Sequence, residues 1–110
     1  MKPNNRIAIG FSASAYNLLH RLKARGHVNL IALTPGAASQ LDLASEQLLI
    51  EKPQKIFQSF WHPGSTFIVI GAIGAVVRII APLVAEKNND PAVLVIDSKA
   101  KNIVPLLGGH

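Results

Sequence analysis

The sequence predicts an α/β domain of three layers, in which a mainly parallel sheet of about five strands lies between helices. Short, fully apolar runs typical of strands buried on both faces alternate with segments whose apolar residues recur at helical spacing. Residues 6–33 read as strand, helix and strand, a unit that makes parallel sheet through a right-handed crossover. At 110 residues, the chain is long enough to bury a core as one domain.

The amino-terminal part begins with a strand over residues 6–11 that ends beside a glycine. A helix follows, with Ser12 or Ser14 as its cap and basic residues in its last turn, where the helix dipole favours cations. Gly26 stands where a helix commonly ends on a left-handed residue. Residues 28–33 then predict the second strand.

The middle of the chain gives weaker signals. Residues 34–38 predict a turn, and residues 41–49 fit one or two helical turns, although residues 48–50 fit an edge strand equally well. Residues 55–61 have apolar side chains at helical spacing, and the His62-Pro-Gly64 sequence ends that helix.

The last third of the chain repeats the pattern of strand, glycine turn and helix. Residues 66–70 are a fully apolar strand, and after the glycine turn a helix is expected to break or restart at Pro82, which cannot donate to the preceding turn. Residues 92–96 predict another buried strand that ends at Asp97. A tight turn then returns residues 102–107 as a last strand that pairs back, antiparallel.

Composition favours a cytoplasmic protein. The chain has no cysteine and no secretory signal, so a disulfide framework and a thiolate zinc site are both excluded. The apolar stretch 67–85 is long enough to raise a membrane helix, but it contains Gly71, Gly74, Pro82 and a central Arg78. Because a central arginine costs about 2.5 to 3.5 kcal/mol on insertion, we expect no membrane span.

The net charge of +5 favours an anionic partner. The basic residues are scattered along the chain and aromatic residues are few, which argues against nucleic acid. A small polyanion that carries carboxylate or phosphate groups fits better.

The segment from Gly71 to Gly74 is the first candidate site. It lies at the carboxyl end of a strand and opens a helix, where open α/β sheets bind ligands and free amides favour anions. The alternative is that the glycines only permit a tight turn. Arg78 stands among apolar residues, so it either pairs with Asp97 or Glu86 as a structural ion pair or binds a substrate carboxylate.

Asp97 and His110 are the candidates for acid–base chemistry. Asp97 follows a strand and could be a general base, although a turn is the commoner role. His110 follows Gly108 and Gly109, which leave the backbone beside the imidazole open. The other histidines are isolated and show no zinc-site spacing, so no metal site is predicted.

Three runs in this region resemble one family. They are Ile70–Leu83, with the motifs G-A-x-G-x-x-V-R and A-P-L, Asp90–Asp97, with D-P-A-V-x-V-x-D, and Val104–His110. Together with Lys87, they resemble the amino-terminal domain of the cobalamin biosynthesis protein CbiG, the cobalt-precorrin-5A hydrolase family. Residues before Ser65 are similar to it only in the order of strands and helices.

This resemblance implies an enzyme of anaerobic vitamin B12 synthesis that opens a δ-lactone on a cobalt-containing tetrapyrrole and releases acetaldehyde. The substrate carries the cobalt, so the resemblance implies no cofactor. It also implies site roles. Carboxylate groups of the substrate would bind at Gly71, Ala72, Gly74 and Arg78, the reacting edge would lie at Gly108 and Gly109, and the catalytic residues would be His110 and Asp97.

Two departures from the family pattern bear on these roles. Gly108 stands where many relatives have serine, which excludes a serine nucleophile there. The family pattern continues beyond His110, so we expect residues 1–110 to be one domain of a longer parent, inactive without the remaining domains. Two alternatives stay open: a non-catalytic corrinoid-binding domain in a protein fused to precorrin-3B methyltransferase, and an unrelated anion-binding module.

Overall fold

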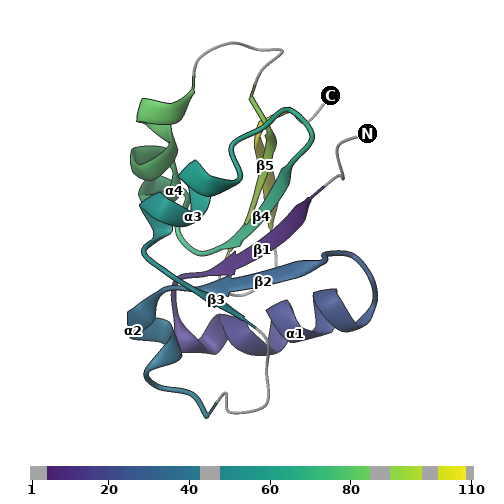
Figure 1. The fold of residues 1–110 in the computed structure, drawn as a ribbon, viewed down its shortest axis with the longest axis vertical. Helices are drawn as coiled ribbons and strands as arrows, with labels where there is room; N and C mark the ends of the chain where they lie inside the picture. Colours follow the sequence, from purple (N-terminus) through teal and green to yellow (C-terminus); the bar gives the residue numbers. More distant parts are fainter. Residues whose placement is uncertain (1–4, 43–47, 85–89, 98–101, 109–110) are drawn as a thin grey trace.

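The computed structural model describes residues 5–42, 48–84, 90–97 and 102–108. Within them, one six-stranded sheet has the order β3-β2-β1-β4-β5-β6 (Figure 1). Neighbouring strands are parallel except for the last pair, β5 and β6, which is antiparallel. The strands are β1 (Arg6–Gly10), β2 (Leu30–Leu33), β3 (Leu49–Ile50), β4 (Thr66–Ile70), β5 (Ala92–Ile96) and β6 (Ile103–Leu107).

Helices cover both faces of this sheet, as the three-layer prediction requires. One face carries α3 and α4, and the other carries α1 and α2 (Figure 1). A 3-10 turn precedes α1 and another follows α4. The helical segments are η1 (Ala13–Ala15), α1 (Tyr16–Ala24), α2 (Pro35–Ala38), α3 (Pro53–Ser59), α4 (Ile73–Ile80) and η2 (Ala81–Leu83).

The α/β prediction is confirmed, with one strand more than the five expected. The additional strand is β3, where Leu49 pairs with Ala32 at the end of β2. The helical alternative for this stretch falls mostly on residues 43–47, which lie outside the described residues. Strand β2 begins at Leu30, two residues later than predicted. Before it, the side chain of Asn29 bonds to β1: Asn29 Oδ1 accepts the Arg6 amide at 2.8 Å, in place of a regular strand hydrogen bond.

Two helix starts differ from the prediction, and proline explains both. The predicted turn at residues 34–38 is the one-turn helix α2, with Pro35 in its first turn and the Thr34 hydroxyl accepting the Ala37 amide at 3.3 Å. Helix α3 begins at Pro53 instead of residue 55 for the same reason. The predicted break at Pro82 is confirmed, since α4 ends at Ile80 and a 3-10 turn restarts with Pro82 in its first turn.

The core forms because the central strands are apolar on both sides. Ile7 and Ile9 of β1 point to the face covered by α3 and α4, whereas Ala8 points to the face covered by α1. All three side chains are fully buried. Burying a side chain the size of isoleucine stabilises the fold by about 1.5 to 3 kcal/mol, so residues on both faces of the sheet contribute to stability.

Aromatic rings close the end of the core near the amino end of β4. Phe57 of α3 and Phe67 of β4 have ring centroids 4.8 Å apart, and Trp61 lies 5.9 Å from Phe67. The indole Nε1 of Trp61 donates to Asp90 Oδ1 at 3.3 Å, which ties the end of α3 to the approach to β5. A buried indole N–H needs such a partner.

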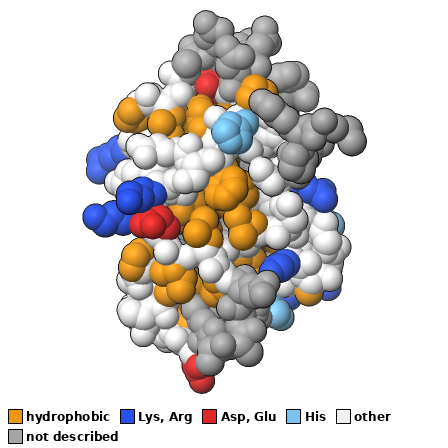
Figure 2. Space-filling view, in the orientation of Figure 1, with side chains coloured by type: hydrophobic (Ala, Val, Ile, Leu, Met, Phe, Trp, Pro, Cys, Tyr) orange, Lys and Arg blue, Asp and Glu red, His pale blue; other side chains and the backbone are white. Residues whose placement is uncertain are grey.

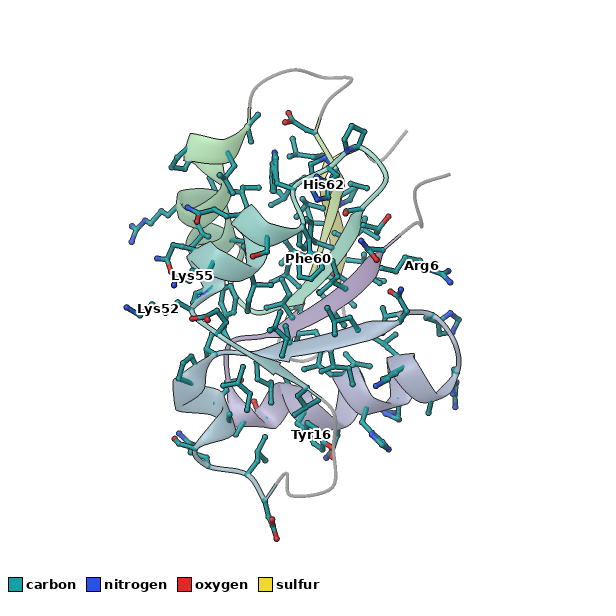
Figure 3. The ribbon with its side chains drawn as sticks, viewed as in Figure 1. Arg6, Tyr16, Lys52, Lys55, Phe60 and His62 are labelled. Carbon is teal, nitrogen blue, oxygen red and sulfur yellow. The ribbon has the colours of Figure 1, made fainter. Side chains whose placement is uncertain are left out.

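The surface keeps apolar side chains in two places. Figure 2 shows hydrophobic side chains gathered in the middle of the face that carries α3, and Phe60 is partly buried there (Figure 3). The second place is the edge strand β6, where Ile103 is 63% exposed and Pro105 pairs with Leu94. Among the helices of the described residues, none is long and apolar enough to cross a membrane.

Gly10 provides a test of how closely α1 approaches the sheet. A β-carbon at Gly10 would lie 2.8 Å from Leu19 Cδ1 and 3.0 Å from the β-carbon of Ala15. We expect Gly10→Ala to lower the free energy of unfolding by about 1 to 3 kcal/mol, because overpacking forces the helix outward. Urea unfolding followed by the fluorescence of Trp61, the single tryptophan of the chain, measures this change.

The matched control is Gly36→Ala, since a β-carbon at Gly36 meets nothing within 4 Å. That variant should be as stable as the wild type or slightly more stable, because alanine favours the helix. Equal stability of the two variants would show that α1 does not need the glycine at β1.

Candidate functional site

The strand order places a crevice between β1 and β4. Strand β1 is followed by β2 on one side, whereas β4 pairs with its other side, so the chain connections diverge at the carboxyl ends of this pair. Ligands of open α/β sheets bind at such a point. Gly71 follows β4 there, and a β-carbon on it would lie 3.3 Å from the ring of Phe11. A larger residue at position 71 would therefore crowd the Phe11 ring.

Helix α4 begins at this edge without a side-chain cap. Its N-cap residue is Ala72, which has no hydrogen-bonding side chain, so the amides of Ile73, Gly74 and Ala75 have no acceptor within the helix. A β-carbon at Gly74 would meet nothing within 4 Å. Nothing in the described residues requires glycine at position 74, and the open space beside these amides is accessible to an anionic group.

A second helical start lies at the end of β1. Ser12 is the N-cap residue of η1, which runs on into α1, yet its side chain makes no capping hydrogen bond. Its hydroxyl lies 2.9 Å from the hydroxyl of Ser14. One proton serves this bond, so the other hydroxyl keeps a proton that can be donated elsewhere. Of the two serines predicted to cap this helix, Ser12 occupies the N-cap position of η1, but neither η1 nor α1 receives a side-chain capping hydrogen bond.

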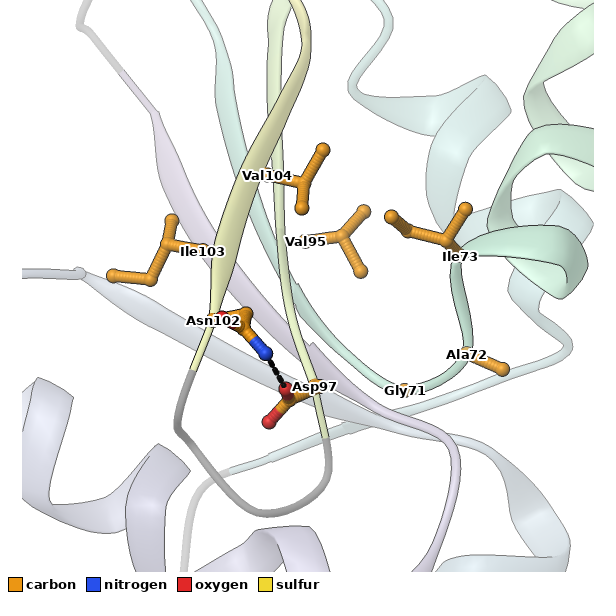
Figure 4. Close-up of a pocket in the computed structure, with 8 residues that line it drawn as sticks. All are labelled: Gly71, Ala72, Ile73, Val95, Asp97, Asn102, Ile103 and Val104. Carbon is orange, nitrogen blue, oxygen red and sulfur yellow. Dashed lines mark hydrogen bonds between the residues drawn. The ribbon is translucent and has the colours of Figure 1, made fainter.

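A cavity of about 480 Å³ opens beside the start of α4 (Figure 4). Val95 and Val104 on the hairpin of β5 and β6 face Ile73 across it. The size is that of a small-molecule site. Its lining consists of Gly71, Ala72, Ile73, Val95, Asp97, Asn102, Ile103 and Val104.

Asp97 supplies the charge among the lining residues. Its Oδ2 accepts a hydrogen bond from Asn102 Nδ2 at 2.9 Å, and its amide donates to the carbonyl of Asn102 at 3.1 Å. The two bonds hold the carboxylate of Asp97 against Asn102 in the cavity lining (Figure 4). Sequence reasoning missed Asn102, although the predicted hairpin would have placed it opposite Asp97.

Arg78 lies outside this cavity lining and is exposed on α4. Its apolar neighbours in sequence do not surround it in space, because Val76 and Ile80 face the core from the other side of the helix. Asp97, one of its two predicted partners, accepts a hydrogen bond from Asn102. The alternative partner Glu86 lies outside the described residues.

Gly108 lies at the opposite end of the sheet from Asp97. Strand β6 runs back along β5, so Gly108 packs against Ala92 at the start of β5, where a β-carbon would lie 3.0 Å from the Ala92 Cα. Five residue rises of β5 separate Ala92 from Asp97, about 16 Å. The backbone of Gly108 has φ 65°, so glycine is required by the fold. Gly109 and His110 lie outside the described residues.

The structure therefore divides the predicted site residues into two groups. Gly71, Ala72 and Asp97 meet around one cavity, with Gly74 beside it, whereas Gly108 is at the other edge. The remaining histidines do not join either group as metal ligands: among the described residues, no three acidic, histidine or cysteine side chains gather as a metal site. His20, for example, stacks on Tyr16 with centroids 5.9 Å apart.

Comparisons with known proteins bear on this region. The family described as cobalamin synthesis G N-terminal matches residues 55–110. The cobalt-precorrin-5A hydrolase of Priestia megaterium is 39% identical over 64 residues, which cover 58% of this chain and 17% of that protein. The enzyme of the same name from Salmonella typhimurium is 50% identical over 46 residues, 42% of this chain and 13% of that protein.

A solved structure resembles the whole described fold. It is a cobalamin biosynthesis protein G homologue from Sulfolobus solfataricus, which superposes with a TM-score of 0.63 over 97% of this chain and 30% of its own. At 20% identity, this likeness supports the fold alone. The family match spans just over half of the chain and includes the start of α4, the cavity and Gly108. The chain therefore belongs to the cobalamin synthesis G N-terminal family, as the motifs between Ile70 and His110 predict.

Proposed function

We propose that this chain supplies the corrinoid-binding part of a cobalt-precorrin-5A hydrolase, which opens the δ-lactone of a cobalt-containing tetrapyrrole and releases acetaldehyde during cobalamin biosynthesis. Both curated relatives carry that enzyme name, and the chain spans less than a fifth of either. The observation that supports the proposal best is the cavity of about 480 Å³ at the carboxyl edge of β4 and β5. The motifs shared with the family build that edge.

Carboxylate groups of the macrocycle would bind outside the cavity, where the start of α4 presents its amides. The amides of Ile73 and Gly74 have no acceptor within the helix, and the positive end of the helix dipole favours an anion there. Gly74 leaves room for close approach. Arg78, exposed one turn further along α4, would reach a carboxylate group at the periphery of the ligand.

The cavity itself would receive an uncharged edge of the macrocycle. Val95, Val104 and Ile73 make its walls apolar, and Asp97 would repel a second carboxylate. An uncharged edge that carries a hydrogen-bond donor fits both features. The orientation of the ligand would follow from these two preferences, with carboxylates toward α4 and the apolar edge toward the hairpin.

The chemical step needs an activated water and a donor for the developing oxyanion. Asp97, which accepts a hydrogen bond from Asn102 and lines the cavity, would accept the proton. The amides at the start of α4, which have no side-chain cap, would donate to the oxyanion. His110, predicted as the base, lies outside the described residues, and its role stays a prediction.

The separation of Asp97 from Gly108 favours one second candidate. In it, this domain only binds the corrinoid, and other domains carry out the lactone opening. Under either proposal the cobalt belongs to the substrate, and we expect the protein to act in the cytoplasm.

Binding of a corrinoid to this chain is the first test. Titration with a cobalt corrinoid polycarboxylate, followed by the absorbance of the macrocycle, should show saturable binding, and Gly74→Ala should weaken it by about fivefold or more, because the methyl group fills the space beside the amides. The variant should be as stable as the wild type or up to about 1 kcal/mol more stable.

Gly36→Ala is the matched control for this change. Gly36 occupies the equivalent position in α2 and has the same open surroundings, but the start of α2 is capped by Thr34. Its substitution should leave corrinoid binding unchanged. Absence of binding to the wild type at millimolar corrinoid would rule out both corrinoid proposals.

Acetaldehyde release distinguishes the catalytic role from a binding role. In a form of the protein that turns over the substrate, Asp97→Asn should lower kcat at least about 100-fold if Asp97 moves a proton, while substrate binding persists. His110→Ala should abolish release if the histidine is the base. Full turnover by both variants would leave this domain with the binding role alone.

A further inference from the structure

The amino edge of the domain carries a separate hollow at the end of α1. It has a volume of about 140 Å³ and is lined by Leu18, Arg21, Leu22, Arg25 and His27. Helix α1 runs antiparallel to the strands, so its end lies at the edge opposite to the cavity beside α4. The hollow is therefore distinct from the candidate corrinoid site.

Positive charge gathers at this hollow, and no carboxylate stands among its described lining residues. Arg21 and Arg25 are exposed and lie one helical turn apart, and Lys23 is in the same turn. Arg6 adds a further cation, because its Nη2 lies 3.5 Å from the carbonyl of Gly26 (Figure 3). In the described part of the chain, the carboxylates belong to Asp42, Glu51, Asp90 and Asp97, and none of them lines the hollow.

The arginine side chains are not required to cap the carbonyls at the end of α1. The carbonyls of Arg21, Leu22 and Lys23 accept backbone amides of Arg25, His27 and Gly26 at 2.9 to 3.0 Å, in a turn closed by the left-handed Gly26. The guanidinium groups are therefore not needed as caps. The helix dipole supplies the equivalent of only about half a negative charge, whereas like charges one turn apart repel each other.

The remaining walls are apolar. Leu18 and Leu22 lie one turn apart on α1, are partly buried, and pack against the core on the α1 side of the sheet. The hollow thus combines two guanidinium forks, which match planar or tetrahedral oxyanions, with a leucine floor. A bare anion would contact only the two arginines, whereas an anion attached to a small apolar group would contact the arginines and the leucines.

We propose that the hollow at the end of α1 is a binding site for an oxyanion, carboxylate or phosphate, carried on a small apolar body. It rests on the charge and shape of this edge, independently of the corrinoid proposal. Arg21 and Arg25 hold the anion, and Leu18 and Leu22 contact its apolar part.

NMR titration of the whole 110-residue chain at constant ionic strength tests the proposal, with inorganic phosphate, phenyl phosphate and phenylacetate as probes. Saturable shifts of the Gly26 and His27 amides are expected. Phenyl phosphate should bind at least about threefold more tightly than inorganic phosphate because of the leucine floor. Comparison of phenyl phosphate with phenylacetate identifies the preferred head group.

Arg21→Gln combined with Arg25→Gln should weaken binding at least about tenfold, because two charge-assisted hydrogen bonds are lost. Arg21→Lys with Arg25→Lys keeps the charge but removes the forks, and should bind with intermediate affinity. The control, Lys52→Gln with Lys55→Gln, removes the same charge from the exposed side of α3 and should bind like the wild type.

Three results would overturn the proposal. The first is equal binding by wild type and the double glutamine variant of the arginines. The second is an equal loss of binding affinity in the lysine control variant, which would show that binding depends on net charge and not on the two arginines. The third is the absence of saturable shifts at Gly26 and His27.

Discussion

The parallel pairing of β1 with β4 is the constraint on which the other features depend. Gly10 lies opposite Ile70 in this register, and the strand residues that face the helices are almost completely buried. Such strands cannot shift by one residue without moving apolar side chains to the wrong face. The register therefore fixes where both strands end, and with it the place where α1 and α4 begin. The open edge beside Gly71 is a consequence of this pairing.

The two edges of the sheet differ in chemistry. The carboxyl edge offers uncapped amides, a pair of serine hydroxyls and an apolar cavity with one carboxylate. The amino edge is tied together by Trp61 with Asp90 and by the contact of Gly108 with Ala92. A site that needs open backbone amides is therefore easier to build at the carboxyl edge, whereas the hollow at the end of α1 on the amino edge depends on side chains.

Much of the fold could be predicted from the sequence, because strands buried on both faces produce continuous apolar runs that few other structures share. The central strands and the break at Pro82 belong to this group. Short elements such as β3 and α2 were harder, since a two-residue strand exists only through its partner and a one-turn helix depends on one cap. The position of Gly71 after an apolar strand and before a helix was enough to predict it as part of a candidate site.

Other site features depended on geometry that the sequence does not display. Arg78 stands among apolar residues in the sequence but is exposed, because residues two apart on a helix face different directions. The positions of Asn102 and Gly108 follow from the pairing of the last two strands: the predicted hairpin sets Asn102 against Asp97 and carries Gly108 to the opposite edge. Both placements could therefore be inferred only through the strand pairing, because composition and local spacing alone do not contain them.

The composition of the sheet's outer strands affects how the protein behaves at high concentration. Exposed strand edges attract strands of other molecules, which is a common route to aggregation. Here one outer strand, β3, is two residues long, and the other, β6, contains Pro105, which has no N–H to offer an incoming chain. The apolar side chain of Ile103 is thus displayed on a strand that is a poor template for further pairing. A protein this rich in buried β-structure can remain dispersed because the two ends of its sheet are unsuited to growth.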